Sequence, residues 1–235
     1  GYESGYLQNN NFRNRMYNFE LLALYNNSWG NFDFNATLGG NLYKVNNQTI
    51  VTTAKDMKIR DVVALMSFNE VSVEPYSYRK QINSIYGAVN LGWKHMLYFD
   101  ATLRGDQSST LPISNNMYIY PSFSGSFVFS ELLKLGDKLP YGKVRMSWAQ
   151  VGSDTDPYQL GLVYTKSKFA YPGYTIGYIS NGTIPNKDLK PTKTNSFEMG
   201  LELKFLKNRI GLDFTYYSQL SKNQIMGMAS SWTSG

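Results

Sequence analysis

Apolar and polar residues alternate along many short runs of this chain. A clear example is "SFEMGLELKF", residues 196–205. Successive side chains of a β-strand point to opposite faces, so this run gathers its apolar side chains on one face. Those apolar residues are Phe197, Met199, Leu201, Leu203 and Phe205. The run therefore predicts a strand with one apolar face and one polar face.

The same two-residue period recurs in other parts of the sequence. Regular runs occupy 31–42, 96–104, 121–129, 143–148 and 209–217, and less regular ones occupy 16–25 and 82–93. Together they predict about eight strands joined by turns. Several of them approach the roughly 10 residues that a tilted strand needs to cross a bilayer.

The connections between these runs alternate in length. Short links fall at 26–28, 94–95 and 207–209, an intermediate link falls at 131–142, and long segments occupy 43–78, 105–115 and 152–192. Outer-membrane β-barrels combine short periplasmic turns with long extracellular loops, which explains this alternation. A soluble β-sandwich, whose apolar face packs on a second sheet, remains the alternative. The pattern favours an all-β fold, an antiparallel transmembrane β-barrel.

A transmembrane barrel assigns a role to each face of the strands. We expect the apolar face to touch lipid through Phe197, Leu201, Leu203, Phe205, Leu212 and Phe214. Aromatic residues near strand ends predict an interfacial girdle comprising Tyr25, Trp93, Phe129 and Tyr216. The opposite face would line a polar lumen with Glu20, Asp33, Asp100, Arg104, Arg145, Glu198, Glu202, Lys204 and Asp213. A basic side chain placed towards lipid instead would cost roughly 2–4 kcal/mol at the bilayer midplane.

Composition supports a strand-rich chain and excludes several classes of site. Of 235 residues, 19 are Tyr, 13 are Phe and 4 are Trp, which suits many strands. No cysteine is present, so disulfides, thiolate metal sites and cysteine nucleophiles are excluded. No apolar run approaches the roughly 18 residues of a spanning helix. The net charge of +6 comes without a dense basic run, so nucleic acid binding is not supported.

Candidate catalytic chemistry is weak in this sequence. Glu198 and Glu202 lie on one predicted strand, about 13 Å apart by strand rise. Paired carboxylates in glycoside hydrolysis lie roughly 5–10 Å apart, so this pair does not fit that chemistry. The single histidine, His95, falls in a short link and is expected to be an exposed turn residue. We therefore expect no enzyme, no metal site and no cofactor.

One long connection is rich in aromatic residues. The stretch 163–186, "VYTKSKFAYPGYTIGYISNGTIPN", interleaves them with glycine and polar residues. Such rings could contact a substrate or a partner, or they could pack among themselves to hold a long loop folded. The candidate contact residues are Tyr164, Phe169, Tyr171, Tyr174 and Tyr178.

Three stretches of the chain resemble a known family. "IYPSFSGSFVFSE" (119–131), "GKVRMSWAQVGS" (142–153) and "NKDLKPTKTNSFEMGLELKFLKNRIGLDFTYYSQLSKNQI" (186–225) are similar to the C-terminal barrel portion of SusC/RagA-like TonB-dependent transporters of Bacteroidota. The chain departs from the family pattern in the residue order of "RGDQSS" (104–109) and at Thr192. These departures concern loop detail.

The resemblance implies a place and a function for the chain. It implies a bacterial outer-membrane barrel of about 22 strands, of which residues 1–235 would form a sector of about eight strands within one barrel domain. The plug domain and the TonB-contact segment would lie outside this chain. It further implies TonB-dependent uptake of glycan fragments or peptides, with membrane lipid, a SusD-like lipoprotein lid and the TonB complex as partners. The alternative is a barrel that serves as a structural or interaction scaffold in a surface complex.

Overall fold

The computed structural model describes residues 5–59, 62–133, 136, 139–162, 164–166, 174, 177–179 and 185–227. In chain order, the elements are β1 (Tyr6–Trp29), β2 (Phe32–Met57), η1 (Leu65–Ser67), β3 (Phe68–Trp93), β4 (Leu97–Ser108), η2 (Ile113–Asn115), β5 (Met117–Phe127), α1 (Phe129–Leu133), β6 (Tyr141–Ser153), β7 (Tyr164–Lys166), β8 (Gly177–Ile179), β9 (Thr192–Phe205) and β10 (Ile210–Lys222). The helices in the described part of the chain are short, and none could span a membrane.

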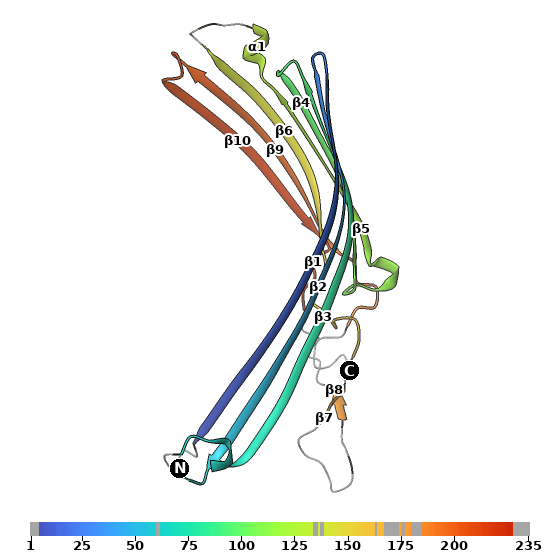
Figure 1. Ribbon diagram of the computed structural model, residues 1–235, viewed down its shortest axis with the longest axis vertical. Coiled ribbons are helices and arrows are strands. Elements are labelled where there is room, and N and C mark those ends of the chain that lie inside the picture. The colour runs from blue at the N-terminus through green and yellow to red at the C-terminus, as the bar shows by residue number, and fades with distance from the viewer. Residues whose placement is uncertain are drawn as a thin grey trace, which may run out of the picture. The chain divides into compact units, whose positions relative to one another are not determined.

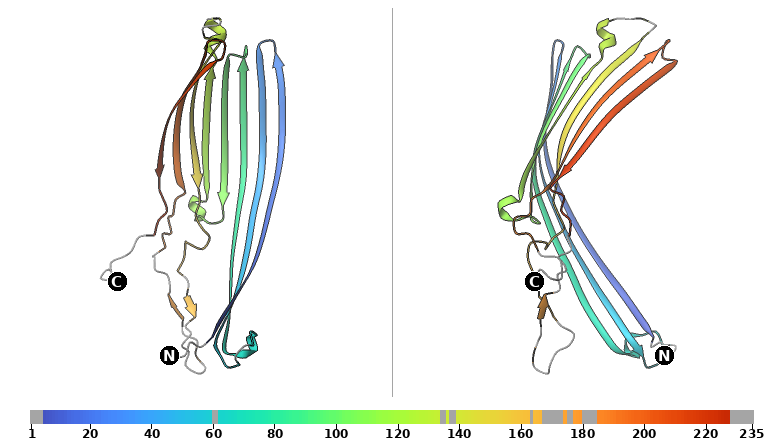
Figure 2. Two further views of the ribbon diagram at one scale, coloured as in Figure 1. Left: turned by 90° about the vertical axis from the view of Figure 1, so that its left-hand side faces the viewer. Right: turned by 180° about the vertical axis from the view of Figure 1, so that it is seen from behind.

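Eight of the strands form one antiparallel sheet in the order β1-β2-β3-β4-β5-β6-β9-β10. Neighbours in this sheet are also neighbours in sequence, apart from the long connection between β6 and β9 (Figures 1 and 2). That connection carries β7 and β8, which pair with each other as a separate two-stranded sheet. The predicted all-β, antiparallel sector of about eight strands is confirmed.

The chain divides into two compact units. The first unit comprises residues 1–18 and 43–81, and the second comprises 19–42 and 82–235. Within the first unit, Ala54 and Phe68 are buried, and the Asn69 amide donates a hydrogen bond to Asp56 at 2.6 Å. The polar row and the pockets considered below lie in the second unit.

The prediction of a long loop at 43–78 is wrong. Strand β2 continues to Met57 and β3 begins at Phe68, so the connection between them covers only 58–67. In this part of β2, "NNQTIVTTAKDM" contains Thr, Val and Ile, which favour strands. However, polar residues occur at both odd and even positions, so the two-residue period that identifies a strand with one wet face is lost.

Two of the three short turns predicted from the sequence are present in the structure. The turns at 94–95 and 207–209 are confirmed, since Lys94, His95, Lys207 and Asn208 adopt the positive φ angles of tight hairpin turns. The turn predicted at 26–28 is wrong, because β1 continues to Trp29 and the chain reverses at Gly30 with φ of 60°. Glycine adopts that conformation without steric cost, and this fixes the turn there.

The apolar face of the second unit is open. Leu212 and Phe214 have exposed fractions of 53% and 62%, so no described segment covers them. The β-sandwich alternative requires a second sheet packed on this face. Such a sheet is absent from the described residues of the unit.

Candidate functional site

Strand register divides the side chains of the second unit between two faces. Residues directly opposite each other in antiparallel strands share a face. One continuous row across six strands is polar throughout: Asn90, Asp100, Ser124, Ser147, Glu198 and Tyr217. A row on the other face is apolar throughout: Trp93, Leu97, Phe127, Val144, Leu201 and Phe214. The alternation in the sequence therefore becomes two continuous surfaces of opposite character.

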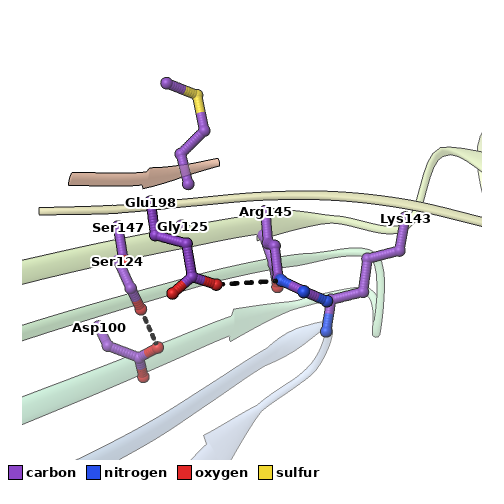
Figure 3. A pocket seen from close by; sticks show the side chains of 9 residues that line it. Asp100, Ser124, Gly125, Lys143, Arg145, Ser147 and Glu198 are labelled. Atoms are coloured by element: carbon purple, nitrogen blue, oxygen red, sulfur yellow. Dashed lines mark hydrogen bonds and ion pairs between the residues drawn. The ribbon is translucent and has the colours of Figure 1, made fainter. Parts of the chain in front are cut away.

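A polar pocket of about 210 Å³ lies on the polar row (Figure 3). The middle of the pocket is lined by small residues, namely Ser124, Gly125, Ser126 and Ser147, and charged side chains surround them. The charged lining residues are Asp100, Lys143, Arg145 and Glu198. Two carboxylates and two cations around a hydroxyl-rich wall offer hydrogen-bond donors and acceptors to a polar ligand.

A run of hydrogen bonds holds Asp100 in place. The Ser124 hydroxyl donates to one carboxylate oxygen of Asp100 at 2.7 Å, and the Asn90 amide donates to the other. Asn90 in turn accepts a hydrogen bond from Asn35 at 3.1 Å. These four side chains come from β2, β3, β4 and β5, so the run connects four strands along the polar face.

Arg145 spans two neighbouring strands. Its guanidinium lies 3.6 Å from Glu198 on β9 and 3.3 Å from Asp213 on β10, and it donates to the Thr215 hydroxyl at 2.7 Å. It passes directly over Gly200, where an added Cβ would lie 2.5 Å from Arg145 Nε. Glycine at this position therefore lets the arginine lie flat across β9.

Tyr86 repeats this arrangement at the other side of the unit. Its hydroxyl donates a hydrogen bond to Glu20 on β1, and its ring crosses Gly39 on β2. A Cβ at Gly39 would lie 2.3 Å from the ring. The Arg104 guanidinium stacks over the same ring at 5.4 Å. Alternation placed these charged residues on one face, but it gave no sign that glycines would let side chains cross a strand.

A second polar cluster follows "RGDQSS". Asp106 is buried and is satisfied by Arg104 at 2.9 Å and by the Tyr120 hydroxyl. Farther along, Ser108 and Thr110 donate to the Asp154 carboxylate at 2.5 Å and 3.1 Å. These contacts tie the end of β4 to the chain after β6, so the stretch has a structural role here.

The predicted lipid-facing residues all lie on the apolar face. Leu201 is opposite Phe214, Leu203 is opposite Leu212, and Phe205 is opposite Ile210. Phe197, on the same face of β9, is half-buried, and its register partner on β6 is Trp148. Their contact with lipid stays a prediction.

Of the predicted girdle residues, Tyr25 and Trp93 lie near strand ends. The prediction is wrong for the positions of the other two, because Tyr216 lies at the middle of β10 and Phe129 lies outside the strands. Tyr25 packs on Phe34 with ring centroids 6.0 Å apart, Trp93 lies 6.4 Å from Phe32, and Tyr216 is exposed. Phe129 does not belong to a strand, because β5 ends at Phe127 and Phe129 begins α1. Its ring instead packs against Gly142 at the start of β6, which lacks a side chain that would block it.

The aromatic loop is only partly described. Phe169 and Tyr171 lie outside the described residues. Tyr164 and Tyr178 belong to β7 and β8, and Tyr174 is 74% exposed. A substrate or partner contact by these residues stays a prediction.

Metal chemistry finds no support in the described part of the chain. No group of three or more His, Asp or Glu side chains there could hold a metal ion. The His95 side chain is 86% exposed and its Nδ1 lies 4.0 Å from Asp33, so it is the exposed turn residue that was expected.

Comparison with known proteins gives consistent matches. A family model described as "TonB dependent receptor-like, beta-barrel" matches residues 1–235. TonB-dependent receptor P3 of Formosa agariphila is 25% identical over 210 residues, covering 85% of this chain and 20% of that protein. TonB-dependent receptor SusC of Bacteroides thetaiotaomicron is 30% identical over 147 residues, covering 59% of this chain and 15% of that protein. The chain thus spans about a fifth or less of these relatives.

Solved structures match at the level of the fold. The RagAB peptide transporter has a TM-score of 0.82 at 21% identity, covering 91% of this chain and 24% of that one. The RagAB peptide importer in its "open-open" state has a TM-score of 0.80 at 22% identity, covering 92% and 24%. At this identity, the likeness establishes how the strands are arranged.

Proposed function

We propose that this chain, which belongs to the TonB dependent receptor-like β-barrel family, forms one sector of the barrel wall of an energised nutrient importer. The family and its SusC relative place the chain in the bacterial outer membrane. The import activity of the whole protein is the proposal. Residues 1–235 would belong to a single barrel domain, with a plug domain and a TonB-contact segment contributed by other parts of the protein.

The observation that carries this proposal is the pair of opposed rows on the sheet. An apolar row crossing six strands suits lipid, and the polar row behind it suits an aqueous passage. A barrel wall needs both surfaces, because the hydrocarbon excludes charge while a hydrophilic solute needs hydrogen-bonding groups along its path. The pocket around Asp100 and Glu198 supplies such groups.

Substrate and partners are inferred from the family. We infer uptake of glycan fragments or peptides, a SusD-like surface lipoprotein as a lid, and energy delivered by the TonB complex. The relatives carry the names of receptors, which supports transport in preference to enzymatic activity. The loop residues Tyr164, Tyr174 and Tyr178 are candidate contacts for the substrate or the lid.

Uptake measurements test the importer function. Cells carrying and lacking the full gene would be compared for uptake of labelled oligosaccharides and peptides, in the presence and absence of TonB. We expect uptake of at least one class to require both. Uptake that is unchanged by loss of the gene or of TonB would contradict the importer and favour the scaffold alternative.

A further inference from the structure

A second pocket of the same unit combines basic and apolar side chains. It has a volume of about 420 Å³ and lies where β5 and β9 begin and β10 ends. We call it the lysine pocket. Its polar lining includes Lys190, Lys193, Ser114 and Asn115, and its apolar lining includes Met117 and Ile119.

Strand geometry places the lysine pocket on the apolar face of the sheet. Residues separated by an even number of positions on one strand share a face. Lys193 therefore lies on the same face of β9 as Phe197. Met117 and Ile119 likewise share the face of Phe127 on β5. Because this is the face that we assign to lipid, the pocket belongs to the outer surface of the proposed barrel and not to its polar passage.

The pocket lies at the border of the apolar band. On the lipid-facing side of β9, apolar residues run from Phe205 back to Phe197, and Asn195 and Lys193 come next. Asn195 accepts a hydrogen bond from Gln150 of β6 at 2.8 Å, so the change to polar residues occurs on both strands. From Phe205 to Lys193 a strand rises roughly 40 Å, or roughly 30 Å along the membrane normal at the usual tilt of about 40°. This equals the thickness of the hydrocarbon core, roughly 30 Å, and we expect Lys193 at the level of the lipid headgroups.

The lengths of the connections indicate which leaflet these headgroups belong to. In outer-membrane barrels, short turns face the periplasm and long connections face the outside. The tight turn at 207–209 follows one end of β9, whereas Lys193 lies at the other end, directly after the long connection from β6. The lysine pocket is therefore expected beside the headgroups of the outer leaflet.

Positive charge gathers at this pocket. Lys193 on β9 lies directly opposite Lys222 on β10, and Lys190 precedes β9 by two residues. Like charges directly opposite in an antiparallel pair destabilise the sheet. Among the described residues, none of these three lysines forms an ion pair, and no Asp or Glu lines the pocket. An anion bound beside the lysines would relieve their repulsion.

We propose that the lysine pocket binds the phosphate group of an outer-leaflet lipid. Basic pockets at a membrane surface attract anionic lipid headgroups. The lysine ammonium groups would pair with phosphate oxygens, and the Ser114 hydroxyl and the Asn115 amide supply further hydrogen bonds. Met117 and Ile119, which are 61% and 51% exposed, offer apolar surface to an acyl chain of the same lipid. The inference rests on the assignment of this face to lipid, and it does not depend on import.

Native mass spectrometry tests this assignment. Delipidated full-length protein in detergent would be titrated with monophosphoryl lipid A and, separately, with the same lipid after enzymatic removal of its phosphate. We expect the phosphorylated lipid to bind about tenfold more tightly than the dephosphorylated lipid. Inorganic phosphate, titrated alone, should bind more weakly than the phosphorylated lipid, because it has no acyl chains to bury.

Variants assign the effect to the pocket. K190Q/K193Q should raise the Kd of the phosphorylated lipid about tenfold and bring it close to that of the dephosphorylated lipid. K190R/K193R keeps the charge and should retain binding. Lys187→Gln, an exposed lysine of the same connection that does not line the pocket, should leave binding unchanged. Heat-shifted mobility in gels would check that each variant is folded.

Each outcome bears on one claim. Equal binding of the two lipids, or an unaffected K190Q/K193Q variant, overturns the lipid site even if TonB-dependent uptake continues. Inorganic phosphate that binds as tightly as the phosphorylated lipid would overturn the assignment to a lipid. Phosphate-selective lipid binding without any TonB-dependent uptake supports the pocket and contradicts only the importer.

Discussion

Single glycines decide how charged side chains lie on the polar face. Arg145 crosses Gly200 to reach Asp213, and Tyr86 crosses Gly39 to reach Glu20. In both cases a long side chain passes over the neighbouring strand and bonds to the strand beyond it. It can do so because the neighbouring strand has a glycine, without a Cβ, at the crossing point. The sequence could predict which residues share this face, but the crossing depends on the register between strands that are distant in sequence.

The substitution Gly200→Ala tests the crossing. A methyl group 2.5 Å from Arg145 Nε should displace the guanidinium from Asp213 and Thr215. We expect a loss of about 1 kcal/mol, since the partners are half-exposed and exposed pairs contribute little. Urea titration of the refolded full-length protein in detergent would measure it. Gly211→Ala is the matched control, because nothing lies within 4 Å of the position that its added methyl group would occupy. Equal effects of the two substitutions would count against the crossing.

The lipid-facing assignment is also tested residue by residue. Leu201→Arg or Phe214→Arg should reduce assembly in the outer membrane, because an arginine facing lipid costs roughly 2–4 kcal/mol near the midplane. Ser196→Arg, on the polar face opposite Gln219, should be tolerated. The measurement is the fraction of full-length protein that is folded in isolated outer membranes. Equal tolerance at all three positions would contradict the assignment.

At the scale of elements, sequence reasoning worked where a strand has one wet face and one apolar face. Strands β4, β6, β9 and β10 were located well, because hydrocarbon demands strict alternation. It failed on β2 beyond residue 42, where polar residues such as Asn46, Asn47 and Thr53 occur at both parities. It also failed at Phe129, where apolar spacing alone did not distinguish the end of a strand from the start of a helix.

The first hairpin turn provides a test at this scale. Gly30 has φ of 60° and no atom within 4 Å of a prospective Cβ, so a substitution there acts through backbone strain alone. Gly30→Val should cost about 1–2 kcal/mol, which is the penalty of the left-handed conformation for an L-residue. Refolding yield and urea midpoint of the full-length protein would report the loss. Gly30→Asn should be milder, since asparagine tolerates this conformation; identical losses would argue against backbone strain.

At the scale of the whole molecule, the eight-stranded sheet has two outer strands, β1 and β10. In hydrocarbon, unpaired backbone groups on such edges are costly, which is why membrane barrels close. Residues 1–235 expressed alone should therefore fail to form a monomer that resists heat in detergent. Gel mobility with and without boiling would show this. A stable, soluble monomer would contradict the assignment to a barrel wall.

The flat course of Arg145 across Gly200 affects anything that moves past this wall. The Arg145 side chain lies along the sheet surface, and its guanidinium contacts the Asp213 carboxylate on β10. It therefore adds charge to the surface without projecting from it. In the proposed importer, a travelling solute would meet a surface that is rich in hydrogen-bonding groups. At this point of the wall, a long charged side chain would be accommodated without narrowing the proposed passage.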